Sequence, residues 1–205
     1  MSRPSTPLSS VLVKIDKYAT DSDREKLYLL ATAVIPYGQV ETLKGVPELF
    51  QCLKGTQFSE NAVKLLQRML SKAGFRSDHV SLLDEHVTKP RDNVPQLPDM
   101  KLQELLISVA DELGNGKYLR QLLYVIPEEK IGVSPGTINS AVQLFQRLLH
   151  EQTISADNQR TLDDLAQWLQ EVGRKDIAKK WFGFGTAVQE QGLLHINKYI
   201  IIVYK

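Results

Sequence analysis

Apolar residues recur at intervals of three and four along most of the chain, a spacing that places them on one face of an α-helix. The clearest runs lie in residues 8–18, 27–34 and 63–70. The alternation of apolar and polar residues that is typical of a β-strand is nearly absent before residue 195. The pattern therefore predicts an all-α protein. The residues of the three runs are Leu8, Leu12, Ile15 and Tyr18; Leu27, Leu30 and Val34; and Val63, Leu66, Met69 and Leu70.

Local signals predict where some of these helices begin and end. Thr20 and Asp23 have the spacing of a capping box. Ser22 and Glu25 repeat that spacing, so we expect a helix to begin near this point. Gly74 follows an apolar run and fits the position just after a helix, where glycine adopts a positive φ without steric cost.

A proline-rich segment divides the chain. Residues 88–99 (TKPRDNVPQLPD) hold three prolines and little apolar content, which indicates a linker. We therefore expect a first domain over 8–87, a linker over 88–100, a second domain over 101–185 and a tail over 186–205. Each domain is small but long enough to form a helical core.

The two predicted domains repeat each other weakly at an offset of about 95 residues. An apolar pair, a Leu-Phe pair and a glycine followed by Arg-x-Asp occur in the same order in both. A repeat of this length in two copies indicates tandem domains rather than a solenoid. The matched segments are Leu29-Leu30 with Tyr124-Val125, Leu49-Phe50 with Leu144-Phe145, and Gly74-Phe-Arg76-Ser-Asp78 with Gly173-Arg174-Lys-Asp176.

In these motifs the sequence resembles the death effector domain family, a branch of the six-helix death-fold superfamily. That family carries an apolar pair in its second helix, a Leu-Phe in its fourth, and Arg-x-Asp-Leu where helix five meets helix six. The resemblance covers most of the chain outside its N-terminal tip, the linker and the tail. It implies an all-α fold of two tandem six-helix antiparallel bundles.

The sequence departs from the family pattern in several places. Family members pair the Arg-x-Asp motif with an acidic residue on helix two, and Asp23 matches it in the first half. Tyr118 stands there in the second half, so that charge triad is incomplete. His79 replaces the usual leucine after the first motif, and Leu29 and Tyr124 stand where phenylalanine is usual.

The resemblance implies a cytoplasmic, non-catalytic regulator of apoptosis that modulates caspase activation. Its partners would be death-effector-domain proteins, namely a Fas-associated adaptor or an initiator procaspase, and it would self-associate into filaments. The layout is similar to that of the short FLICE-like inhibitory proteins. A prodomain or isoform fragment of an initiator caspase and an unrelated helical scaffold are the alternatives. The implied protein-binding residues are Asp23, Leu29, Leu30, Arg76, Asp78, Tyr124, Val125, Arg174 and Asp176.

The charged motif admits two interpretations. The planar guanidinium of Arg76 can bridge two carboxylates, those of Asp23 and Asp78, and so fix the angle between two helices. Alternatively, Asp78 caps the last helix and Arg76 is solvated. The same alternatives apply to Arg174 and Asp176 in the second half.

The apolar pairs also admit two interpretations. Adjacent helical residues point about 100° apart, so one of Leu29 and Leu30 can face the core while the other is an exposed anchor for a partner's groove. Alternatively, both belong to the core. Tyr124 and Val125 have the same two possibilities. An anchor that meets a different surface on the next protomer makes a heterologous contact, which grows a chain unless its rotation closes.

Composition narrows the function classes. The 25 Lys and Arg residues balance 24 Asp and Glu residues, and a net charge of +1 argues against binding nucleic acid through its phosphates. Cys52 is the single cysteine, so no internal disulfide or thiolate zinc cage is possible. Residues 1–8 lack the apolar core of a secretory signal, and no apolar run approaches the ~20 residues of a membrane span.

No catalytic or cofactor motif is found. Cys52 lacks the Gln-Ala-Cys-x-Gly context of a caspase nucleophile. Gly114-Asn-Gly116-Lys lacks the spacing of a phosphate loop. We therefore expect no enzyme activity, cofactor or metal. Residues 192–205 are rich in β-branched side chains and fit an edge strand, a segment packed on the second domain, or a disordered tail. The histidines, which show no metal-ligand pattern, are His79, His86, His150 and His195.

Overall fold

The computed structural model describes residues 6–87 and 96–183. These residues form twelve α-helices and no strand, which confirms the all-α prediction for the described chain. The expected tail, the histidine at 195 and most of the proline-rich segment lie outside the described residues.

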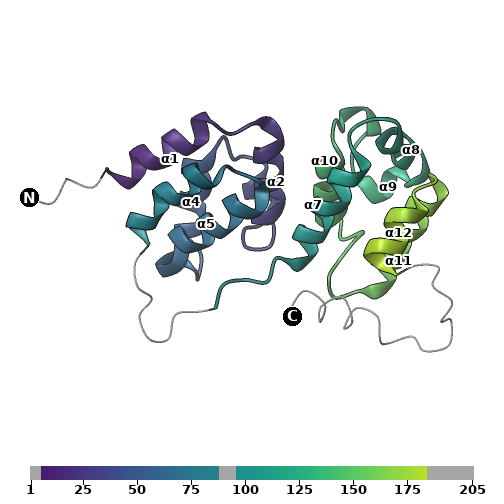
Figure 1. The fold of residues 1–205 in the computed structure, drawn as a ribbon. Helices are drawn as coiled ribbons and strands as arrows, with labels where there is room; N and C mark the ends of the chain where they lie inside the picture. Colours follow the sequence, from purple (N-terminus) through teal and green to yellow (C-terminus); the bar gives the residue numbers. More distant parts are fainter. Residues whose placement is uncertain (1–5, 88–95, 184–205) are drawn as a thin grey trace, which may run out of the picture.

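The first half contains six of the helices (Figure 1). Two 3-10 turns, η1 (Ser59–Asn61) and η2 (Ser81–His86), accompany them. Helix α5 packs against α2, α4 and α6, and α1 packs against α4, so the helices enclose one apolar centre. The helices are α1 (Leu8–Lys17), α2 (Asp21–Ala31), α3 (Tyr37–Val40), α4 (Val46–Lys54), α5 (Ala62–Ala73) and α6 (Ser77–Val80).

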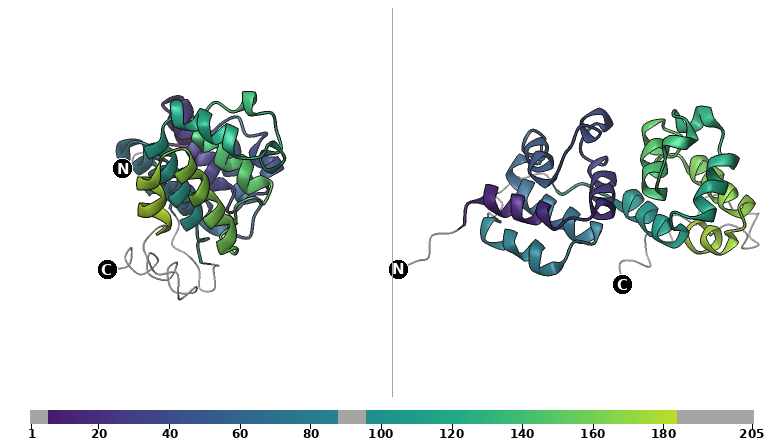
Figure 2. Two further views of the ribbon diagram at one scale, coloured as in Figure 1. Left: turned by 90° about the vertical axis from the view of Figure 1, so that its right-hand side faces the viewer. Right: turned by 90° about the horizontal axis from the view of Figure 1, so that it is seen from above.

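The second half repeats this order with six further helices and one 3-10 turn, η3 (Pro135–Thr137). Here α7 packs against α10 and α12, and α11 packs against α8 and α12. Figure 2 shows the two halves side by side. The helices are α7 (Lys101–Leu113), α8 (Lys117–Val125), α9 (Glu128–Ile131), α10 (Ala141–His150), α11 (Gln159–Glu171) and α12 (Lys175–Phe182).

The predicted helix ends agree with the structure. Thr20 is the N-cap of α2, and its hydroxyl accepts a hydrogen bond from the Asp23 amide while the Asp23 carboxylate accepts one from the Thr20 amide. Gly74 caps α5 with a φ of 95°, and Gly173 follows α11 with a φ of 85°. The spacing Ser22 to Glu25 does not form a capping box, because the helix already begins at Asp21.

Of the two interpretations of the Leu29-Leu30 pair, the structure agrees with the one that places both leucines in the core. Both side chains have 0% exposure. Helix α2 is covered on two sides, by α5 of its own half and by α7 and α10 of the other half (Figure 1). Leu29 lies one turn after Glu25, whose carboxylate contacts α10, so Leu29 faces the second half.

Candidate protein-interaction surface

The two halves are joined by a polar contact centred on Glu25 of α2. Its carboxylate accepts hydrogen bonds from the Ser140 hydroxyl at 2.6 Å and from the Gln143 amide at 2.7 Å. The Gln146 amide donates to the Glu25 carbonyl at 2.9 Å. Four ion pairs also cross between the halves within the described residues: Lys26–Asp111 at 2.7 Å, Glu41–Arg147 at 2.8 Å, Lys72–Glu104 at 2.8 Å and Arg68–Glu104 at 3.6 Å.

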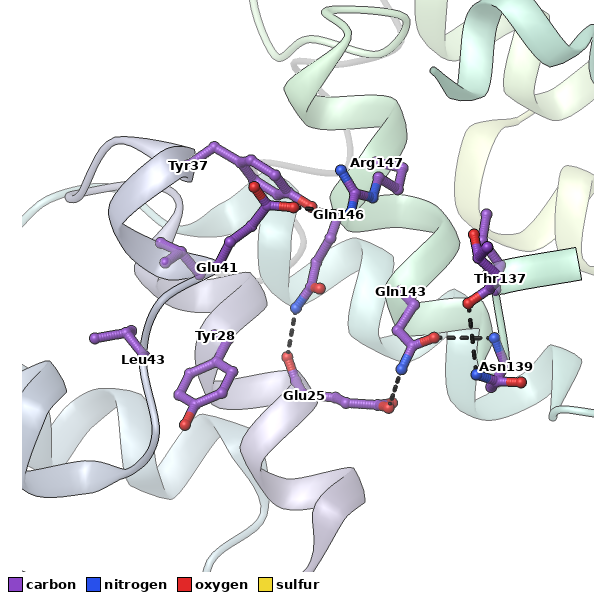
Figure 3. Close-up of a pocket in the computed structure, with 12 residues that line it drawn as sticks. Glu25, Tyr28, Tyr37, Glu41, Leu43, Thr137, Asn139, Gln143, Gln146 and Arg147 are labelled. Atoms are coloured by element: carbon purple, nitrogen blue, oxygen red, sulfur yellow. Dashed lines mark hydrogen bonds and ion pairs between the residues drawn. The ribbon is translucent and has the colours of Figure 1, made fainter. Parts of the chain in front are cut away.

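A pocket of about 440 Å³ lies within this contact (Figure 3). Helices α2 and α3 and the segment after α3 form one wall, and η3, the segment after it and α10 form the other. None of the residues predicted to bind a partner lines it. The residues that do are Glu25, Tyr28, Tyr37, Val40, Glu41, Leu43, Thr137, Ile138, Asn139, Gln143, Gln146 and Arg147.

In the first Arg-x-Asp motif, Arg76 and Asp78 form a bidentate ion pair, the first fork, instead of a triad that includes Asp23. The Arg76 guanidinium donates to both carboxylate oxygens of Asp78, at 3.2 and 2.8 Å. Asp23 makes no ion pair with Arg76 within the described residues, because its carboxylate caps α2. Asp78 also accepts a hydrogen bond from the His79 amide, as expected of a residue at the start of α6.

The fork shifts the titration of Asp78. Desolvation alone would raise the pKa of this carboxyl group, but the hydrogen bonds and positive charge of Arg76, together with His79, outweigh it and hold the pKa below its usual value. Asp78 therefore stays ionised in mildly acidic solution. Because both Arg76 and Asp78 are exposed, the pair presents two opposite charges on the surface.

A stacked aromatic pair, an exposed tyrosine and a half-buried histidine, adjoins this fork. The rings of Tyr18 and His79 are stacked with their centroids 4.6 Å apart. The apolar periodicity placed Tyr18 on the buried face of the first helix, but Tyr18 follows the end of α1 and is 54% exposed. Sequence spacing gave no signal for the stack, since Tyr18 and His79 are 61 positions apart in the chain.

The second Arg-x-Asp motif forms a more buried fork. The Arg174 guanidinium donates to both oxygens of Asp176, at 2.9 and 2.7 Å, and to the Glu112 carbonyl oxygen at 2.8 Å. Its carbon centre lies 4.9 Å from the centre of the Tyr118 ring. The aromatic ring therefore contacts the guanidinium at the position where the family pattern has a carboxylate. The side chain of Arg174 is only 14% exposed, against 76% for Arg76.

Glu112 extends this fork toward the end of α12, and sequence reasoning missed it. Its carboxylate accepts hydrogen bonds from Lys180 and from the Trp181 ring nitrogen. The hydrogen bond from Lys180 is the main reason that the pKa of Glu112 is lowered, against the opposing effect of desolvation. The three residues meet only because α12 packs on α7, so no local spacing could have revealed them.

The Arg174–Asp176 pair predicts a pH dependence of stability. The hydrogen bond from Arg174 is the main cause that lowers the pKa of Asp176 from 3.8 to about 2. A carboxyl group with a depressed folded-state pKa stabilises the protein above its unfolded-state pKa, and this contribution is lost as the pH falls. We expect the difference in unfolding free energy between wild type and Asp176→Asn to be constant above about pH 5 and to vanish between about pH 4 and pH 2.

Urea denaturation of both proteins from pH 6 to pH 2 measures that difference. The same series with Asp157→Asn, an exposed residue of the same half, is the control. A difference that stays constant down to pH 2 would contradict the assigned pairing.

The second apolar pair differs from the first in its exposure. Tyr124 of α8 is 91% exposed, and Val125 is partly buried against the core. Helix α8 is the second helix of its half, as α2 is of the first. The prediction of an outward anchor is thus met geometrically by Tyr124 and not by Leu29 or Leu30. Whether Tyr124 contacts a partner stays a prediction.

Within 6–87 and 96–183, no group of three or more His, Cys, Asp or Glu side chains could hold a metal ion. Cys52 is a free, half-buried thiol. Among the described helices, none has the length and apolar content required to cross a bilayer.

The described residues therefore define an all-α protein of two packed helical halves, with an Arg–Asp ion pair in each half and two exposed tyrosines, Tyr18 and Tyr124. Comparisons with protein-family models, curated proteins and solved structures found no match to this chain.

Proposed function

We propose that this chain is a non-catalytic regulator of apoptosis that binds death-effector-domain proteins by homotypic contacts and modulates caspase activation. Its partners are a Fas-associated adaptor and an initiator procaspase, which places its action in the cytoplasm. The proposal rests on the sequence motifs and on one structural observation, the contact between the two halves.

That contact is heterologous. The second helix of the first half, α2, packs on the first and fourth helices of the second half, α7 and α10. The corresponding surfaces at the two ends of the molecule are not covered by the described chain: Tyr124 of α8 is 91% exposed, and Val13 of α1 is 60% exposed. Because the contact joins two unlike surfaces, the first half still has a free surface of one kind and the second half a free surface of the other kind. Further domains of the same kind can therefore add at either end of the molecule through the same contact.

Exposed charges of both signs flank the two end surfaces, and α8 itself carries the exposed cations Lys117 and Arg120. Glu128 and Glu129 of α9 lie beyond the end of α8 and are exposed. Lys14 of α1 and Lys54 of α4 are exposed in the first half. Opposite charges on surfaces that meet favour the correct register and speed association more than they add affinity. An exposed tyrosine provides the apolar anchor that such a contact needs.

The test is Tyr124→Ala. If Tyr124 is the central anchor of the contact, its truncation costs about 2 kcal/mol, so we expect association with the adaptor or procaspase domains to weaken by about thirtyfold, with unchanged helicity. Co-precipitation and filament assembly measure association, and circular dichroism measures helicity. Lys179→Ala, which alters an exposed residue of α12 in the same half, is the matched control.

Two results would contradict the proposal. Wild-type protein that neither binds these partners nor changes caspase activation at a fixed adaptor concentration would leave an unrelated helical scaffold as the better interpretation. Binding of the Tyr124→Ala variant with wild-type affinity would show that α8 is not the contact surface. Titration of the wild-type protein against caspase activation also reveals the sign of regulation, because a bound chain either extends an assembly or caps it.

A further inference from the structure

The contact inside the molecule provides a template for a contact between molecules. Helix α2 of the first half packs on α7 and α10 of the second half. In the order of the repeat, α8 corresponds to α2, and α1 and α4 correspond to α7 and α10. Helices α1 and α8 lie toward opposite ends of the molecule (Figure 1). Each end therefore presents the counterpart of one side of the internal contact.

The two halves correspond residue by residue over these helices. Helices α4 and α10 begin 95 positions apart, and the same offset superimposes their buried side chains. It also superimposes the buried leucines of α2 and α8. Because the core positions share one register, the surface positions between them correspond as well. The matched buried pairs are Val46 with Ala141, Leu49 with Leu144, Phe50 with Phe145, Leu53 with Leu148, and Leu27 with Leu122.

This register exchanges the charges of the internal contact. There, the Glu25 carboxylate of α2 accepts a hydrogen bond from the Gln143 amide of α10 at 2.7 Å. At the corresponding positions, α8 carries Arg120 and α4 carries Glu48, and both are exposed. Within residues 6–87 and 96–183, Arg120 forms no ion pair. The Glu48 carboxylate accepts a hydrogen bond from the Lys44 amide and keeps further acceptor capacity for a guanidinium.

The apolar positions of the two end surfaces also correspond to the internal contact. Tyr124 stands at the position of Leu29 and is 91% exposed. On the receiving side, Asp111 of α7 pairs with α2, and Ser108, three positions earlier, lies on the same face of α7. The counterpart of Ser108 on α1 is Val13, which is 60% exposed. The same arrangement between two molecules therefore brings an exposed tyrosine to a helix face that carries an exposed valine.

The charges also disfavour one incorrect pairing. If α2 of one molecule docked on α4 of another, Glu25 would meet Glu48, and two like charges repel. The exposed lysines of the α1 and α4 surface, Lys14 and Lys54, occupy other positions of the repeat than the hydrogen-bond partners of Glu25. Helix α4 is thus complementary to α8 and not to α2.

We propose that α8 binds α1 and α4 of a second copy of this chain, in the arrangement that joins the two halves. Arg120 pairs with Glu48 of the next copy, and Tyr124 packs on its α1 beside Val13. This docking rests on the proposed function, because it extends the homotypic contact to a particular partner. The contact is heterologous, so each added copy keeps one free surface for the next.

The experiment measures self-association of the full chain by sedimentation velocity from about 5 to 200 µM. We expect wild-type protein to associate as its concentration rises. Arg120→Glu and Glu48→Arg are each expected to weaken association by at least about tenfold, because each places like charges opposite one another. An equimolar mixture of the two variants is expected to regain wild-type assembly, since each variant then presents the charge that the other requires.

Two variants control for the charge changes. Lys179→Glu and Asp157→Arg alter exposed residues outside α1, α4 and α8, and both are expected to associate as wild type does. Circular dichroism checks that all four variants are folded. The mixture is the sharper control, because two misfolded chains cannot restore each other's assembly.

Three results would overturn this inference: wild-type protein that stays monomeric up to about 200 µM, folded single variants that associate as wild type does, or a mixture that does not recover. Binding to the adaptor domain, measured on the same proteins, separates this outcome from the proposed function. A monomeric chain that binds the adaptor overturns only the docking of a second copy. A chain that assembles in this register but binds neither adaptor nor procaspase supports the docking and contradicts the proposed partners.

Discussion

Leu30→Ala is expected to lower the free energy of unfolding by about 2 to 5 kcal/mol, the usual effect of truncating a fully buried leucine. Leu30 has 0% exposure and lies on α2, the helix that contacts both halves of the molecule. Removal of its side chain loses apolar burial and leaves a cavity that a close-packed interior fills only in part. Urea denaturation followed by circular dichroism measures the change.

Val13→Ala is the control for this experiment. Val13 is 60% exposed on α1, so its truncation is expected to change the unfolding free energy by less than about 0.5 kcal/mol. A small effect of Leu30→Ala, combined with loss of partner binding, would contradict the burial of this residue and restore it as an exposed anchor. Loss of stability together with binding supports the core role.

Arg174→Ala is expected to destabilise the second half by about 2 to 3 kcal/mol, as for the loss of buried charge-assisted hydrogen bonds. The reason is burial: the side chain is 14% exposed, and its loss leaves the Glu112 carbonyl without its donor and the Tyr118 ring without its cation. The contribution of Asp176 is smaller than that of Arg174, because Asp176 is 64% exposed and water screens its charge.

The chain provides its own control in the equivalent motif. Arg76 forms a fork of the same kind with Asp78, but both side chains are exposed. Arg76→Ala is therefore expected to leave the unfolding curve unchanged, while a contact role would appear as weaker association with the proposed partners. Equal destabilisation by Arg76→Ala and Arg174→Ala would show that burial does not distinguish the two forks.

The two forks also show which contacts can be inferred from the spacing of a motif and which cannot. An arginine and an aspartate two positions apart at the start of a helix are close enough to pair whatever surrounds them, and both pairs form. The further partners come from distant helices. The carboxylate of Asp23 accepts a hydrogen bond from the Thr20 amide and so caps its own helix. Tyr118 lies against Arg174 because α8 and α12 belong to one packed half.

Sequence alone determined the helical class and several helix ends, because these depend on contacts within a few residues. The three- and four-residue periodicity, the Thr20–Asp23 box and the glycine at 74 all act over one or two turns. Such interactions form in the same way wherever the segment lies, so their residues can be identified from spacing.

Only the tertiary structure decided which apolar residues are covered. Leu29 and Tyr124 occupy equivalent positions in the repeat, yet one is fully buried and the other is 91% exposed. The difference arises because α2 lies between the two halves, while α8 lies away from that contact (Figure 1). Burial depends on which surfaces meet after folding, and the local pattern of each helix carries no information about its distant neighbour.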